Sequence, residues 1–251
     1  MDPDYSPERH RSRSQECVTD PTSTRPLRCH CVSCRRYHTA AFAAFLPVPV
    51  LPSVLANAST VGSVTNYADY CHELGPVDRM FCTQCRSTLA TVVASDGTAL
   101  LALGCLDDDS LSPTAALTWQ CGFDKRQELQ GAQWWNLRPR VAECGGGSLL
   151  DLHGGCACGG ATYHSISGSA LQLQHCYCKL CRQLSGSVGQ TWIPVPQQGF
   201  EWISRESLEL VRTTKHGQRH QCSRCGGVLT IVYDSQPSVI WPVAATVDEA
   251  S

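Results

Sequence analysis

The sequence has few aromatic residues, no large excess of either charge and no long apolar run. The formal net charge is −2 and the sequence pI is about 6.5, so bulk electrostatics would not hold nucleic acid or an anionic membrane. No run reaches the roughly 18 apolar residues of a membrane span, because the nearest candidate, 40–56, is interrupted by prolines. Aromatic residues make up 7% of the chain against 20 glycines, which suits strands and loops better than a helical bundle.

The opening segment MDPDYSPERHRSRSQ contains no apolar stretch of the kind that directs secretion. The chain has 17 cysteines, and an odd count together with the missing leader argues against a disulfide framework. We therefore expect an intracellular, cytoplasmic protein whose thiols stay reduced. Clustered reduced cysteines usually bind metal.

Two halves of the sequence share a spacing pattern. The motif C-x-C-x-x-C occurs twice, Pro-Val-Pro follows each copy at the same offset, a C-x-x-C pair comes later, and an apolar stretch follows that pair. Four matches in the same order predict two related units. The cysteines of this pattern are Cys29, Cys31, Cys34, Cys82 and Cys85 in the first half, and Cys176, Cys178, Cys181, Cys222 and Cys225 in the second.

Short β-prone segments bounded by Gly, Asp, Ser or Pro occur in both halves, and long helical periodicities are absent. The sequence therefore predicts a mainly β protein built of two small tandem domains with metal-bearing loops. The predicted strands are 87–94, 100–103, 161–164, 208–213, 228–233 and 239–243. The predicted organisation is a disordered tail over 1–26, an incomplete domain over 27–118, a linker over 119–150 and a complete domain over 151–251.

The second half contains seven cysteines in three groups, which divide into a set of four and a set of three. Two short pairs flanked by glycine would form a closed four-thiolate zinc site that joins the start of the domain to its end. The remaining three would leave one coordination position for water or substrate, as in catalytic zinc sites. Spacing alone leaves open whether His175 fills that position. The set of four is Cys156, Cys158, Cys222 and Cys225, and the set of three is Cys176, Cys178 and Cys181.

The motifs GGCACGGATY, HCYCKLCRQLSGS and HQCSRCGGVL resemble those of the glutathione-dependent formaldehyde-activating enzyme family, also called the CENP-V/GFA domain. The resemblance covers nearly all of 151–251 and, less completely, 27 to about 118. It implies the β-rich Mss4-like fold and a structural zinc at the first and last cysteine pairs. It also implies a catalytic zinc, with room for the glutathione thiol, at Cys176, Cys178 and Cys181.

The first half departs from this pattern because it lacks the opening G-x-C-x-C-G motif. It keeps candidate metal ligands at Cys29, Cys31 and Cys34 and at the pair Cys82/Cys85. That pair would have two ligands, or three if Cys17 or Cys71 joined it. Arginines that follow the two triplets, Arg35, Arg36 and Arg182, could offset thiolate charge or pair with substrate carboxylates.

The resemblance implies a zinc-dependent carbon–sulfur lyase that acts on a thiol–aldehyde adduct, similar to an S-(hydroxymethyl)glutathione synthase. Paired catalytic carboxylates, a Ser-His-Asp set and a phosphate loop are all missing, so zinc is the visible catalyst. The alternatives are a non-catalytic, zinc-stabilised binding or scaffold module and, less favoured, a C-x-x-C redox protein. The expected partners are a small thiol and an aldehyde, without nucleic acid or membrane. The sequence leaves open the oligomeric state and whether glutathione is the thiol.

Overall fold

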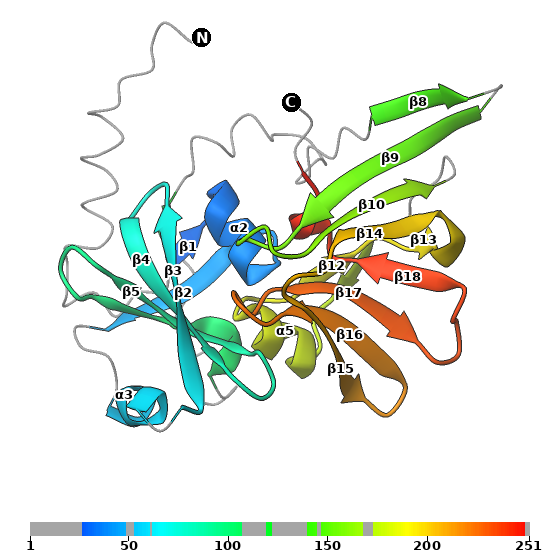
Figure 1. Ribbon diagram of the computed structural model, residues 1–251. Coiled ribbons are helices and arrows are strands. Elements are labelled where there is room, and N and C mark those ends of the chain that lie inside the picture. The colour runs from blue at the N-terminus through cyan, green and yellow to red at the C-terminus, as the bar shows by residue number, and fades with distance from the viewer. Residues whose placement is uncertain are drawn as a thin grey trace, which may run out of the picture.

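The computed structural model describes residues 27–48, 53–60, 62–106, 119–121, 140–144, 147–167 and 173–248. It shows a mainly β protein whose strands form several sheets in two halves (Figure 1), and this confirms the predicted fold class. The predicted disordered tail, 1–26, and residues 122–139 of the predicted linker lie outside the described residues. Within the described residues, no helix is both long and apolar enough to cross a membrane.

The first half is built on a seven-stranded sheet of order β3-β4-β5-β6-β2-β1-β7. Neighbouring strands are antiparallel except β1 and β7, which are parallel. The strands are β1 (Leu27–Cys29), β2 (Ala43–Val48), β3 (Val64–Cys71), β4 (Gly75–Cys82), β5 (Thr88–Val93), β6 (Ala99–Ala102) and β7 (Trp119–Cys121). The helices are α2 (Val32–His38), α3 (Ser53–Thr60) and the 3-10 turn η1 (Leu103–Cys105).

The second half contains a five-stranded sheet of order β13-β18-β17-β16-β15, a four-stranded sheet β14-β10-β9-β8 and the pair β11-β12. The strands of the four-stranded sheet are β8 (Arg140–Cys144), β9 (Gly147–Gly155), β10 (Thr162–Ser167) and β14 (Phe200–Ser204). The others are β11 (Gln174–Cys176), β12 (Gln190–Trp192), β13 (Val195–Pro196), β15 (Leu208–Thr214), β16 (Gly217–Cys222), β17 (Val228–Tyr233) and β18 (Val239–Pro242). The helices are α5 (Lys179–Ser185) and the 3-10 turns η3 (Gln197–Gly199) and η4 (Ala244–Thr246).

The main sheets of the two halves have the same strand order. In the second half the strand order β15-β16-β17-β18-β13 corresponds to the order β3-β4-β5-β6-β2 of the first half. Helix α5 corresponds to α2, and the 3-10 turn η4 corresponds to η1. The four-stranded sheet that carries the G-x-C-x-C-G motif has no counterpart among the described residues of the first half. Strands β8 and β9 begin within the predicted linker range, 119–150.

All six predicted strands are present, as β5, β6, β10, β15, β17 and β18. Strand β17, with the sequence VLTIVY, has the β-branched composition of a central strand and lies between β16 and β18. Helices α2 and α5 were not predicted, because seven residues each are too few to show a helical period.

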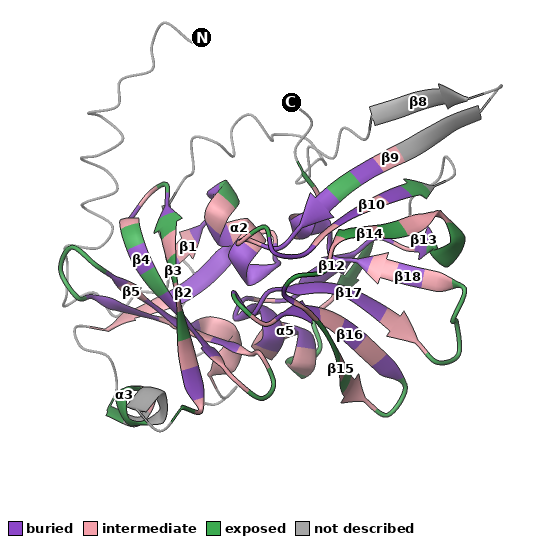
Figure 2. Ribbon diagram, in the orientation of Figure 1, coloured by how far each residue is buried: buried purple, intermediate pink, exposed green. Residues whose placement is uncertain are grey.

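The two halves pack directly against each other through α2 and α5, and buried residues of both helices lie where the halves meet (Figure 2). His38 Nδ1 donates to the Ser185 carbonyl at 2.8 Å, and each of these residues stands four places after the third cysteine of its triplet. Burial lowers the pKa of His38 to about 3, so its ring is neutral at physiological pH. Across the same interface, Gln190 Nε2 donates to Thr39 Oγ1 at 2.8 Å.

Gly186 ends α5 in the left-handed region, at φ 65°, and faces the first half. A Cβ there would lie 2.8 Å from Ala102 Cβ and 2.9 Å from Thr88 Cβ. We expect Gly186→Ala to lower the free energy of unfolding by about 2–4 kcal/mol, from backbone strain and overpacking together.

The matched control is Gly97→Ala, because Gly97 has a similar φ of 74° and nothing within 4 Å of its added Cβ. It should cost only the strain, about 1 kcal/mol. Urea denaturation of both variants checks the difference. Equal losses would show that the packing of the two halves tolerates a methyl group at Gly186.

Candidate metal centres

The four cysteines predicted to clamp the second half lie together. Cys156 and Cys158 stand in the turn after β9, Cys222 ends β16, and Cys225 lies in the turn before β17. Their sulfurs all lie within 4.8 Å of one another, with 3.5 Å from Cys158 to Cys156 and to Cys222. Zinc bound tetrahedrally through Zn–S bonds of about 2.3 Å sets its sulfurs about 3.8 Å apart, so this donor set fits a zinc ion.

The surroundings of this cluster act on its sulfurs in opposite directions: backbone N–H groups stabilise the anions, whereas burial and the neighbouring sulfurs oppose them. The backbone N–H of Ala161 donates to Cys156 Sγ at 3.3 Å, and the N–H of Cys225 donates to Cys222 Sγ at 3.4 Å. The neighbouring cysteine side chains and burial raise the pKa of the Cys225 thiol well above its ordinary range. All four sulfurs can therefore be anionic together only when a cation offsets their charge.

The three remaining cysteines of the second half form a separate cluster. Cys176 ends β11. Cys178 caps the start of α5, and its Sγ accepts a hydrogen bond from the N–H of Cys181 at 3.5 Å. Their sulfurs lie within 4.8 Å of one another, and no fourth His, Cys, Asp or Glu of the described residues joins them. Cys178 is exposed and Cys181 is buried. The cluster thus combines three potential ligands with an approach from solvent.

Arg219 brings a positive charge next to this open cluster. The side chain is buried, its Nη2 lies 3.9 Å from Cys181 Sγ, and its guanidinium lies 5.7 Å from the centre of the Trp192 ring. Although partial burial acts to raise it, the pKa of Cys178 is lowered, because the Cys181 N–H and the neighbouring thiols hydrogen bond to its sulfur. His175 does not join the cluster and instead contacts Thr191 Oγ1 through Nδ1 at 3.0 Å.

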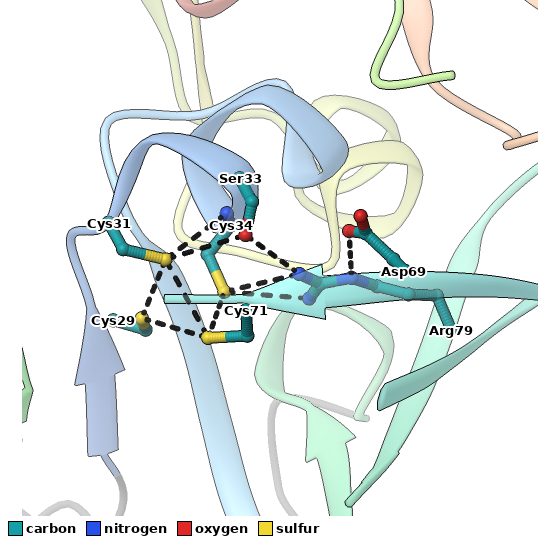
Figure 3. Close-up of polar contacts among 7 residues, drawn as sticks. All are labelled: Cys29, Cys31, Ser33, Cys34, Asp69, Cys71 and Arg79. Atoms are coloured by element: carbon teal, nitrogen blue, oxygen red, sulfur yellow. Dashed lines mark hydrogen bonds and ion pairs between the residues drawn. The ribbon is translucent and has the colours of Figure 1, made fainter. Parts of the chain in front are cut away.

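In the first half, the triplet has a fourth member (Figure 3). Cys71, at the end of β3, joins Cys29, Cys31 and Cys34, and all four are buried. Its sulfur lies 3.5 Å from that of Cys34, 3.6 Å from that of Cys31 and 4.0 Å from that of Cys29. These distances also match the edges of a zinc–sulfur tetrahedron.

Arg79 lies beside this cluster with no exposed surface. Its Nε donates to Asp69 Oδ2 at 2.9 Å, and both Nη atoms lie 3.5 Å from Cys34 Sγ (Figure 3). Its guanidinium also stacks 4.7 Å from the centre of the Tyr37 ring. Arg79 thus brings a buried positive charge to the third cysteine of its triplet, as Arg219 does in the second half.

The pair Cys82/Cys85 belongs to none of the cysteine clusters in the described residues. No third metal-binding side chain joins it within the described part of the chain, and Cys71, considered above as a partner for it, lies with the triplet instead. Cys85 is exposed and its thiol donates to Ser87 Oγ at 3.2 Å. A ligand role for this pair stays a prediction. Cys17, the other partner considered, lies outside the described residues.

One further group of potential ligands lies on the sheet of β9 and β10. His164 Nε2 donates to Asp151 Oδ1 at 2.6 Å, and His153 Nε2 lies 3.2 Å from the same oxygen. His153 and His164 are directly opposite in the strand register, and their rings stack. The hydrogen bond to Asp151 and the stacking account for this arrangement.

The sequence did not point to Arg79 or Arg219, and it offered Cys71 only as a partner for the pair Cys82/Cys85, whereas Cys71 lies with the triplet. Both arginines stand three residues before the first cysteine of the closing pair, so the repeated R-x-x-C was a signal that could have found them. Cys71 has no such signal. Arg36, which was expected to offset thiolate charge or to pair with a substrate carboxylate, forms an ion pair with Asp248 instead.

A family model described as glutathione-dependent formaldehyde-activating enzyme matches residues 14–121 and 151–251. A relative from Halomonas elongata, which carries that same name provisionally, is 29% identical over 103 residues. The match covers 39% of this chain and 66% of the relative, just under two thirds of its length. A crystal structure of a Rhodobacter sphaeroides protein is 18% identical, with a TM-score of 0.32, over 39% of this chain and 90% of that one. This score is too low to compare the folds.

Proposed function

Because this chain belongs to the glutathione-dependent formaldehyde-activating enzyme family, we propose that its second half is a zinc-dependent carbon–sulfur lyase acting on a thiol–aldehyde adduct. One observation carries the proposal: the cluster of Cys176, Cys178 and Cys181 has an exposed member and no fourth ligand among the described residues. The name of the Halomonas elongata relative supports formaldehyde as the aldehyde and glutathione as the thiol.

The side chains of the open cluster would divide the work. Cys181, buried and next to Arg219, and Cys176, at the end of β11, form the inner part of the ligand set, while Cys178 faces solvent. A zinc ion held there would lower the pKa of a thiol that takes the remaining coordination position. The buried charge of Arg219 partly offsets the three thiolates.

The reaction itself joins or separates two small molecules. In the direction of synthesis, the substrate sulfur forms a bond to the carbonyl carbon, the C=O π pair moves to oxygen, and that oxygen takes up a proton in place of the one lost by the thiol. The reverse direction breaks the same carbon–sulfur bond and needs no oxidant or reductant. Reduced thiols are required in the ligand set, so we place the protein in a reducing, cytoplasmic compartment.

The test is to mix the full chain with glutathione and formaldehyde and to follow the hydroxymethyl adduct by NMR. Cys178→Ser should reduce the rate above the uncatalysed background by at least about 100-fold, since removal of a direct ligand exceeds the effect of removing its supporting hydrogen bonds. Cys178 is exposed, so this variant should fold.

Cys85→Ser is the control, because it removes another exposed cysteine that stands outside the described clusters. It should keep the wild-type rate. Zinc content is measured in parallel, and Cys178→Ser should keep the metal of the other clusters. A wild-type rate in Cys178→Ser with that zinc retained would exclude catalysis at this site.

A further inference from the structure

The cysteine triplet of the first half lies in a different kind of cluster from the triplet of the second half. The proposed reaction does not need the cluster of the first half. We propose that Cys71 completes a closed four-cysteine metal centre with Cys29, Cys31 and Cys34. The metal there would be structural, held by the chain alone, with no position for a substrate thiol. The two triplets share a motif but would thus have different roles.

Burial distinguishes the two triplets. In the first half, Cys29, Cys34 and Cys71 have no exposed surface and Cys31 is 6% exposed. In the second half, Cys178, which corresponds to Cys31 in the motif, is exposed. A ligand from outside the chain could therefore reach the second triplet, whereas Cys71 occupies the corresponding approach to the first.

The length of one hairpin explains the presence of Cys71. Arg79 of β4 pairs with Tyr67 of β3, and the corresponding Arg219 of β16 pairs with Val211 of β15. Four residues beyond Tyr67 the chain is still in β3 and reaches Cys71. Four residues beyond Val211 it is already in the turn after β15, at the exposed Lys215. The longer hairpin places a soft ligand over its cluster, and the shorter one contributes no ligand to the cluster of the second half.

The geometry also separates metal ligands from disulfides. The sulfur–sulfur distances to Cys71 are 3.5–4.0 Å, whereas a disulfide bond is about 2.05 Å long. The buried guanidinium of Arg79 has both Nη atoms directed at Cys34 Sγ. A buried positive charge needs negative partners, and a set of metal-bound thiolates supplies them in addition to Asp69.

The test uses cobalt(II) as a spectroscopic substitute for zinc in the full chain. Cys178→Ser disables the open cluster at an exposed position, so the chain loaded with two equivalents of Co²⁺ should report on the two four-cysteine clusters. Its thiolate charge-transfer and d–d bands should be those of tetrahedral four-sulfur sites. They should not change when 2-mercaptoethanol is added, whereas the fully loaded wild-type spectrum should change.

The double variant Cys71→Ser/Cys178→Ser should regain sensitivity to the added thiol and release one metal ion to a chelator about 10- to 100-fold faster. Cys85→Ser/Cys178→Ser is the matched control and should behave like Cys178→Ser. A thiol-dependent spectrum in Cys178→Ser would overturn the proposal, as would unchanged metal release after Cys71 is replaced. If the Cys71 variant does not fold, the spectrum of Cys178→Ser still decides. None of these readouts depends on turnover, so the lyase proposal can fail without affecting them.

Discussion

Cys225→Ser should prevent the second half from reaching its native fold, while Cys85→Ser should leave stability almost unchanged. The two residues hold the same place in the C-x-x-C pairs of the two halves. Cys225 is fully buried within a cluster of four sulfurs, whereas Cys85 is exposed and joins no cluster in the described part of the chain. A structural zinc site of this kind contributes about 10 kcal/mol or more, which is comparable to the whole stability of a domain, about 5–15 kcal/mol.

Near-UV circular dichroism and thermal denaturation of the zinc-loaded chains measure this difference. Cys225→Ser should lose the fixed environment of the aromatic residues packed on the cluster, among them Tyr163 and Trp202. A Cys225→Ser chain that melts at the wild-type temperature would contradict a structural metal at this site. A large loss in Cys85→Ser would instead show that the Cys82/Cys85 pair binds metal through partners beyond the described residues.

The second large effect is expected at Arg79. Replacement by methionine removes a buried guanidinium and leaves Asp69, whose side chain is 15% exposed, without the partner that holds its charge. Breaking a buried ion pair from one side costs about 3–5 kcal/mol. The free energy of unfolding from guanidinium chloride denaturation should fall by that amount. Arg79→Lys should recover part of the loss, because it keeps the charge but cannot contact Asp69 and Cys34 together.

Arg212→Met provides the control, since Arg212 of β15 also forms an ion pair with an aspartate, Asp234, which directly follows β17. Both of those side chains are about half exposed, and exposed ion pairs contribute little to stability. Arg212→Met should therefore resemble the wild type. Similar losses in the two arginine variants would show that Arg79 acts through general packing and not through its buried charge.

The sequence was sufficient for the parts of the fold that depend on local patterns. Strands such as β5 and β17 are short, β-branched and bounded by turn residues, and the C-x-C-x-x-C spacing brings each triplet together within a few residues. Two cysteine pairs from distant parts of the second half, Cys156/Cys158 and Cys222/Cys225, also lie together, as ligand counting and family resemblance predicted. The domain limits and the identity of the metal stay predictions.

Features that depend on distant contacts could not be predicted. Cys71 stands alone in the mostly polar strand VTNYADYC, and nothing in that segment says which triplet or pair it will face. Its position is fixed by the register of β3 on β4 and by the place where the hairpin turns. The helices α2 and α5 are hard to predict for the same reason, because their contacts with the opposite half stabilise them more than their own sequence does.

The contact between α2 and α5 has a consequence for attempts to dissect this protein. Tyr67, from a strand of the first half, packs on the four-cysteine cluster of the second, and Ser187 of the second half donates to the Phe42 carbonyl of the first at 2.7 Å. A fragment that contains only 151–251 would expose this surface to water and leave the helix ends without their partners. The smallest unit whose metal affinity and activity would represent the native chain is therefore the pair of halves together.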